Sequence, residues 1–74
     1  MNSTLKKLFI NKPDLIEEVR YYFCCDDDLL SIYIGEILNL IKYRRWDVID
    51  NIIRNPLKKL YVYKIINYCK RLKT

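Results

Sequence analysis

Apolar residues recur along this chain at intervals of three and four positions, the spacing that places them on one face of an α-helix. Five segments carry the pattern: a short first one that Ser3 or Thr4 can cap, then residues 13–24, 28–44, 46–54 and 56–72. With one Gly and two Pro, the chain has few places to turn, which favours a few helices over many strands.

The segment 28–44 has the widest apolar face of the five. At 100° per residue, its apolar side chains cover about half of the helix circumference; they are Leu29, Leu30, Tyr33, Ile34, Ile37, Leu38, Leu40 and Ile41. Several neighbouring helices must cover such a face, and Gly35 would let one of them approach closely. We therefore predict an all-α fold, a single compact bundle of four to five helices around residues 28–44, with residues 1–74 as one domain.

The starts of two helices are marked by their chemistry. Pro13 suits a first helical turn, because its missing N–H would be unpaired there anyway, and Asp14 suits the positive end of the helix dipole. The acidic run 26–28 stands directly before Leu29, where a carboxylate can accept a hydrogen bond from a free backbone N–H. A calcium loop would need a glycine that this run lacks, so we expect helix capping.

The last helix, residues 56–72, combines apolar and basic positions. One apolar arc contains Leu57, Tyr61, Ile65, Tyr68 and Leu72, and is the face that we expect to be buried. The opposite side carries Lys59, Lys70 and Lys73, with Tyr63 among them. Leu60 falls between Lys64 and Arg71 on the flank, and Ile66 falls at the edge of the arc.

Residues 37–53 form an apolar helix, a short polar turn and an Asp-Val pair that opens a second apolar helix. This stretch resembles one helical hairpin of an ankyrin repeat. The Thr-Pro-Leu-His opening and the turn glycine of that family are absent, and no second copy follows. The resemblance therefore implies a helical hairpin and no function, and we expect Trp46 to fill the junction between its two helices.

Catalytic and metal-binding chemistry finds little support in the composition. The chain has no His, the commonest general base, and no glycine-rich phosphate loop. Its three cysteines include the adjacent pair Cys24 and Cys25 without a C-x-x-C motif, and a zinc site would need a fourth ligand. We predict that the protein is not an enzyme and has no catalytic residue, no metal and no cofactor.

The N-terminus lacks the apolar region of a signal peptide. The longest apolar stretch, residues 29–41, contains Glu36 and is shorter than the roughly 20 residues that a membrane span needs. Three cysteines do not make a disulfide framework. We expect a cytoplasmic or otherwise intracellular protein that is neither secreted nor bound to a membrane.

Charge is distributed unevenly, with a net charge of −3 over residues 1–37 and +8 over residues 38–74. This asymmetry favours an acidic or polyanionic partner for the C-terminal third. Nucleic-acid binding is one hypothesis, since residues 46–54 and 56–72 have a loose helix-turn-helix outline and Tyr63 could stack on a base. The candidate phosphate contacts are Arg44, Arg45, Lys58, Lys59, Lys64 and Lys73.

Protein–protein interaction is the hypothesis that we prefer. The chain has seven Tyr, a residue type enriched in interface hot spots, and Tyr21 and Tyr63 are predicted to be exposed. Ile32, Leu60 and Ile66 also fall outside the buried arcs. The predicted partner-binding residues are Lys59, Leu60, Tyr63, Ile66, Lys70 and Arg71. The partner would be an unidentified protein or a second copy of the chain, as a homodimer.

The composition also carries a hint about origin. It is rich in Ile, Lys, Asn and Tyr, as AT-rich genomes encode. Small chains of this kind are common in large DNA viruses and phages, where many bind a host or viral protein. We therefore expect a viral or phage protein with a binding or regulatory role.

Overall fold

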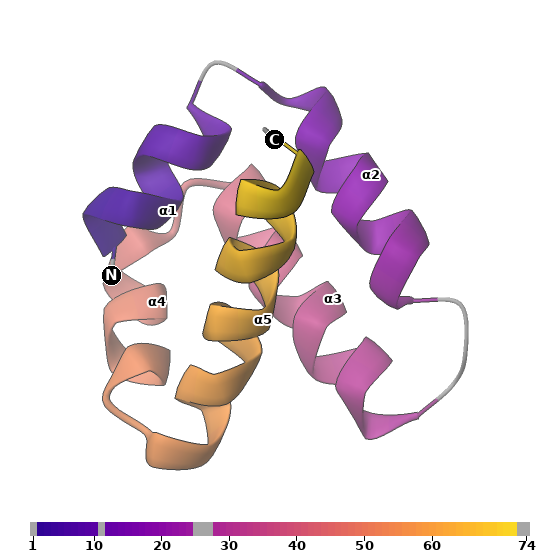
Figure 1. Cartoon of the computed structure of the whole chain (residues 1–74). Coiled ribbons are helices and arrows are strands. Elements are labelled where there is room, and N and C mark those ends of the chain that lie inside the picture. The colour runs from indigo at the N-terminus through magenta and orange to yellow at the C-terminus, as the bar shows by residue number, and fades with distance from the viewer. Residues whose placement is uncertain (1, 11, 25–27, 73–74) are drawn as a thin grey trace.

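Five α-helices make up the fold, and the described residues contain no strand (Figure 1). The computed structural model describes residues 2–10, 12–24 and 28–72. The helices are α1 (Asn2–Phe9), α2 (Asp14–Phe23), α3 (Leu29–Lys42), α4 (Trp46–Ile53) and α5 (Pro56–Leu72). The prediction of a small all-α bundle is confirmed. The radius of gyration, 11.3 Å, agrees with the value of about 11 Å expected for a compact chain of this length.

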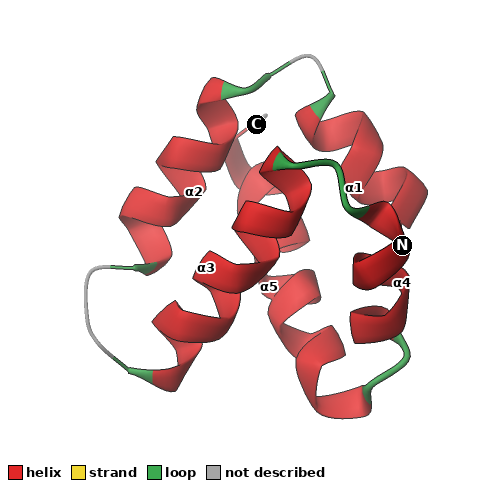
Figure 2. Ribbon diagram, turned by 180° about the vertical axis from the view of Figure 1, so that it is seen from behind, coloured by secondary structure: helices red, strands yellow, loops and turns green. Residues whose placement is uncertain are grey.

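The long helices α3 and α5 organise the bundle. α3 packs against α2, α4 and α5, whereas α5 packs against all four other helices. Figure 1 shows α5 crossing the front of the bundle. Figure 2 views the bundle from behind and shows α3 in front of α5. Every helix contributes to one buried cluster, whose most enclosed side chains are Leu5, Val19, Ile34, Leu38, Ile49, Val62, Ile65 and Cys69.

The connection between α2 and α3 is held by Asp28 and Ser31. Asp28 caps α3 as predicted, since its Oδ1 accepts a hydrogen bond of 2.9 Å from the backbone N–H of Ser31; Asp26 and Asp27 lie outside the described residues. The Ser31 hydroxyl donates to the backbone carbonyl of Phe23. This bond satisfies the Ser31 hydroxyl and lets this polar residue be buried.

The first helix begins earlier than predicted. α1 starts at Asn2, so Ser3 and Thr4 lie within the helix and the prediction that one of them caps it is wrong. α2 begins at Asp14, one residue later than predicted, and Pro13 occupies the N-cap position directly before the first helical turn.

The orientation of α5 differs from the predicted one by roughly a quarter turn. Its fully buried residues are Val62, Ile65, Ile66 and Cys69. Of the predicted arc only Ile65 is fully buried; Tyr61 and Tyr68 are half-buried, and Leu57 and Leu72 are exposed. Both stripes have helical spacing, so periodicity alone does not choose between them. The buried stripe is aliphatic and includes a thiol, whereas the other contains two tyrosines whose hydroxyl groups favour partial exposure.

Candidate interaction groove

Three leucines are exposed around one groove, and they come from the beginning of α3 and the first half of α5. Leu57 is 74% exposed, Leu60 57% and Leu29 67%. Single exposed leucines are ordinary on protein surfaces, but a contiguous apolar patch with a polar rim marks an interaction site. We call this site the Leu57 groove; it is lined by Leu29, Tyr33, Asn55, Leu57, Lys58, Leu60, Tyr61 and Lys64.

Stacked aromatic rings lie between the two helices that form the groove. Tyr33 of α3 and Tyr61 of α5 stack with ring centroids 5.2 Å apart and an interplanar angle of 28°. The ammonium group of Lys58 lies 5.9 Å from the centroid of Tyr33, within the range of a cation–π contact. The groove has a volume of about 440 Å³, within the range of ligand-binding clefts.

The first turn of α5 is fixed by Asn55 and Pro56. The Asn55 Oδ1 accepts hydrogen bonds from the backbone N–H groups of Leu57, at 3.0 Å, and Lys58, at 3.3 Å. Pro56 occupies the first helical position, where its fixed φ and missing N–H cost nothing. This capped start holds the backbone of Leu57 in place, so its exposure is set by the orientation of the whole helix.

A second aromatic cluster adjoins the groove at Lys64, which lines both sites. Tyr22 of α2 stacks on Tyr68 of α5 with centroids 4.2 Å apart, and Phe23 meets both rings edge-on. Burial raises the pKa of the Tyr68 phenol, and the charge of Glu18 adds to this rise. The phenol is therefore neutral at physiological pH, and the cluster offers apolar ring surface beside cations.

The structure separates the predicted partner-binding residues. Leu60 and Tyr63 are exposed as predicted, and the Lys59 ammonium lies 5.7 Å from the Tyr63 ring centroid. Leu60 lines the groove, Arg71 lines the adjoining aromatic site, and Lys70 is exposed. Ile66 is 4% exposed, so its predicted place on the binding surface is wrong. It packs in the core because α5 is rotated toward the Val62 side.

The predicted nucleic-acid contacts fall into two groups. Lys58 and Lys64 line the Leu57 groove and Lys59 lies beside Tyr63, whereas Arg44 and Arg45 lie in the turn between α3 and α4. Arg44 and Arg45 thus precede α4 in the chain, whereas Lys58, Lys59 and Lys64 follow it on α5. Lys73 lies outside the described residues.

The groove residues that the sequence did not reveal are Leu29, Leu57, Tyr33 and Tyr61. The sequence pattern places all four on arcs predicted to be buried, because helical spacing shows which residues share a face and not which face packs against the core. The two apolar stripes of α5 differ in chemistry, and this difference could have identified the buried stripe, since full burial favours the one without tyrosine hydroxyls.

The described residues show neither a metal-binding cluster nor a membrane-spanning helix. They contain no group of three His, Cys, Asp or Glu side chains arranged to hold a metal ion. Within the same part of the chain, no helix has both the length and the apolar character needed to cross a bilayer. The absence of catalysis, metal and cofactor stays a prediction.

No protein-family model, no curated protein sequence and no solved structure matches this chain.

Proposed function

We propose that this protein is a protein–protein interaction module, and that its Leu57 groove receives an amphipathic helix whose apolar stripe is flanked by acidic residues. The observation that carries the proposal is the clustering of Leu29, Leu57 and Leu60 around one groove. A partner that covered these side chains would gain the free energy of burying their apolar surface, about 25 cal/mol per Å².

The helical form of the partner is inferred from the kinds of recognition that the groove permits. The described residues contain no strand, so they offer no sheet edge to which an extended peptide could add its backbone. Recognition must then use side chains, and the apolar face of a helix is the usual occupant of a groove between helices. Leu29 and Leu57, on different helices, provide contacts on the two sides of such an occupant.

The acidic character of the partner is inferred from the charges of the groove. Lys58 and Lys64 are its charged lining residues, and among the described residues no carboxylate lines it. Acidic residues beside an apolar stripe would pair with both lysines and speed association. A second copy of the chain, docked through the same face around a two-fold axis, would instead bring lysines toward lysines. We therefore favour a different protein over a homodimer.

Nucleic-acid binding is a weaker proposal on the same surface. The candidate cations are split between the turn before α4 and the helix after it, and the α5 lysines nearest the groove surround leucines. Leucine side chains contribute little to phosphate contacts, which dominate the affinity for nucleic acid. We also propose that the protein acts inside the cell.

The test uses synthetic 15-residue peptides and the whole protein. One peptide has leucines at helical spacing with Glu flanks, a second has Lys flanks, and a third has the first composition in scrambled order. We expect the Glu-flanked peptide to bind at least about tenfold more tightly than either control. Its amide-shift perturbations in an NMR titration should centre on Leu29, Leu57 and Leu60.

Matched variants give the assay its specificity. Leu57→Glu should weaken binding at least about tenfold, while Leu72→Glu, on the same helix but outside the groove, should leave it unchanged. Equal binding of all three peptides, or equal loss in both variants, would contradict the proposal. So would a homodimer in sedimentation that Leu57→Glu dissociates, or duplex DNA binding at physiological salt that is lost in Lys58→Gln and kept in Leu57→Glu.

A further inference from the structure

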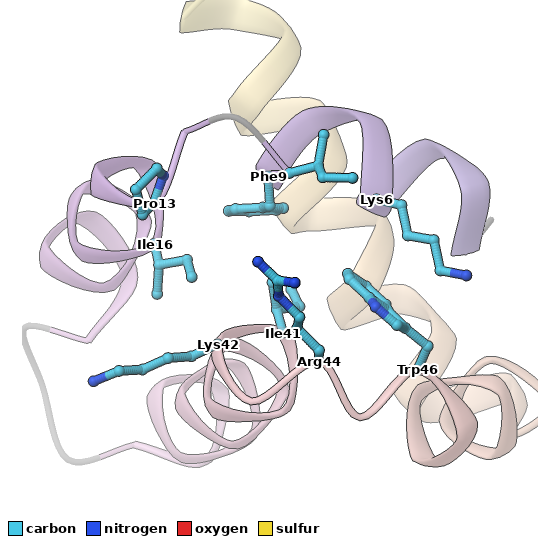
Figure 3. A pocket seen from close by; sticks show the side chains of 9 residues that line it. Lys6, Phe9, Pro13, Ile16, Ile41, Lys42, Arg44 and Trp46 are labelled. Carbon is cyan, nitrogen blue, oxygen red and sulfur yellow. The ribbon is translucent and has the colours of Figure 1, made fainter.

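A separate cavity lies between α1, the start of α2 and the turn that joins α3 to α4 (Figure 3). It has a volume of about 240 Å³ and is lined by Lys6, Phe9, Ile10, Pro13, Ile16, Ile41, Lys42, Arg44 and Trp46. It shares no residue with the Leu57 groove.

Apolar side chains form the walls of this cavity. Phe9, Ile16 and Ile41 are buried, and the half-buried Trp46 packs against the core from the start of α4. Trp46 thus lies beyond the junction of α3 and α4 that the sequence suggests, because it also faces α1, with the Lys6 ammonium 5.5 Å from its ring centroid. An apolar cavity of about 150 Å³ accommodates benzene, so this one has room for one or two fused rings.

The charged residues that line the cavity are all cationic. Lys6, Lys42 and Arg44 line it, and among the described residues no carboxylate does. Figure 3 shows the Arg44 guanidinium directed between Phe9 and Ile41, while Lys6 and Lys42 extend from its two sides. Among the described residues no ion pair to Arg44 is present. A guanidinium at an apolar wall matches a carboxylate, which it can bind through two parallel hydrogen bonds.

The backbone of Arg44 supplies an independent observation. Its φ is 56°, the only positive φ among the described non-glycine residues. The Arg45 N–H donates to the Leu40 carbonyl and the Arg44 N–H to the Ile41 carbonyl, which is the Schellman ending of a helix, where glycine is the usual residue. Arg44 therefore occupies a position that favours glycine, and strained residues of this kind cluster at binding sites.

We propose that this cavity binds a small monocarboxylate with a planar apolar body of one or two rings. The Arg44 guanidinium holds the carboxylate, and the ring lies against Phe9 and Trp46. Lys6 and Lys42 raise the positive potential at the entrance, which favours any anion, and the apolar walls select those with a ring. This binding is independent of the Leu57 groove.

The test is an NMR titration of the whole protein with 2-naphthoate, 2-naphthamide and inorganic phosphate. Trp46 is the only Trp in the chain, so its indole N–H signal reports on the cavity without overlap. We expect 2-naphthoate to shift this signal to saturation and neutral 2-naphthamide to bind at least about tenfold more weakly. Phosphate alone should leave the signal in place. Equal affinity for the acid and the amide, or no shift with 2-naphthoate, would overturn the proposal.

Two neighbouring arginines give a matched pair of variants. Arg44→Gly should raise the Tm, because glycine relieves the positive φ, and yet weaken 2-naphthoate binding at least about tenfold. Arg45→Gln should bind as the wild type does, since the Arg45 Nε lies 3.4 Å from the Asp47 carboxylate and Arg45 does not line the cavity. Unchanged binding in Arg44→Gly, or equal loss in both variants, would show that a diffuse positive potential is responsible, and the assignment of Arg44 would be wrong.

Discussion

The two long helices use their apolar residues differently. α3 has one wide apolar arc, and the residues along its centre, Ile34, Ile37, Leu38 and Ile41, are all buried. α5 has two apolar stripes: Val62, Ile66 and Cys69 of one are buried, whereas Leu57 and Leu60 outside it are exposed. Both helices lie at the centre of the packing, so position in the bundle does not explain the difference.

The difference shows how a small bundle obtains a binding surface. The apolar residues along the centre of the α3 arc are covered by the core, and α3 contributes to the groove through Leu29 and Tyr33 near its start. Apolar residues that extend around a helix exceed what the core can cover, and the excess remains on the surface beside charged groups. On this reasoning α3 mainly stabilises the fold and lines one side of the groove near its start, while the first half of α5 provides the exposed Leu57 and Leu60.

The largest predicted effect is a charge placed in the arc of α3. Ile37 is 2% exposed, so Ile37→Asp should destabilise the protein by about 4 kcal/mol or more and abolish cooperative unfolding. Leu60→Asp, on the exposed side of α5, should keep a transition within a few degrees of the wild type. Circular dichroism on heating measures both. A variant Ile37→Asp that melts like the wild type would place α3 at the periphery.

The next effect compares the two stripes of α5 directly. Ile66→Ala should cost about 2–4 kcal/mol, because it leaves a cavity in the core, whereas Leu57→Ala should change the stability by less than about 0.5 kcal/mol. Urea unfolding provides both free energies. Equal costs would mean that the two stripes are equally buried, and the contrast within α5 would be lost.

Sequence patterns were sufficient for the existence and approximate extents of the helices, because those depend on local chemistry. Pro13, Asp28 and Pro56 mark helix starts through hydrogen bonds and φ values that involve only nearby residues. The orientation of α5 could not be obtained in the same way, since it depends on how α5 fits four other helices at once. The cavity that Arg44 lines could not be predicted from the sequence for a similar reason, because its walls come from residues as far apart as Lys6 and Trp46.

A smaller effect concerns the single glycine in α3. Among the described residues, a Cβ built on Gly35 would meet only the Cys24 Sγ, at 3.9 Å, which is ordinary van der Waals contact. The close helix packing expected of Gly35 therefore does not require a glycine, and Gly35→Ala should stabilise the protein by about 1 kcal/mol. Urea unfolding checks the sign. A destabilised variant would indicate that α2 and α3 lie closer than the structure places them.

The smallest predicted effect is a pH dependence of the stability, which the charged cap of α3 should produce and the uncharged cap of α5 should not. Hydrogen bonding from Ser31 lowers the pKa of the Asp28 carboxyl from its ordinary value, while α5 is capped by the uncharged Asn55. A carboxylate whose pKa is lowered on folding stabilises the protein above its unfolded-state pKa, and this contribution is lost as the pH falls through the folded-state value. Asp28→Asn keeps a capping side chain but removes this titration.

The measurement for this prediction is the difference in unfolding free energy between wild type and Asp28→Asn, from pH 7 down to pH 2. The difference should be constant above about pH 4. Below that pH the wild type should lose stability relative to Asp28→Asn. The corresponding substitution Asn55→Asp should introduce a similar dependence at α5. A difference that stays the same over the whole range would show that Asp28 does not cap α3 through its charge.

The central claim is that α5 presents Leu57 and Leu60 to the solvent and buries Val62 and Ile66. Paramagnetic broadening of methyl signals by a neutral soluble nitroxide tests it most directly, in protein that is labelled at Leu, Val and Ile methyl groups. The account predicts strong broadening at Leu57 and Leu60, weak broadening at Val62 and Ile66, and protection of the two leucines when the Glu-flanked peptide is bound. Broadening of Val62 and Ile66 that equals or exceeds that of the leucines in the free protein would contradict it.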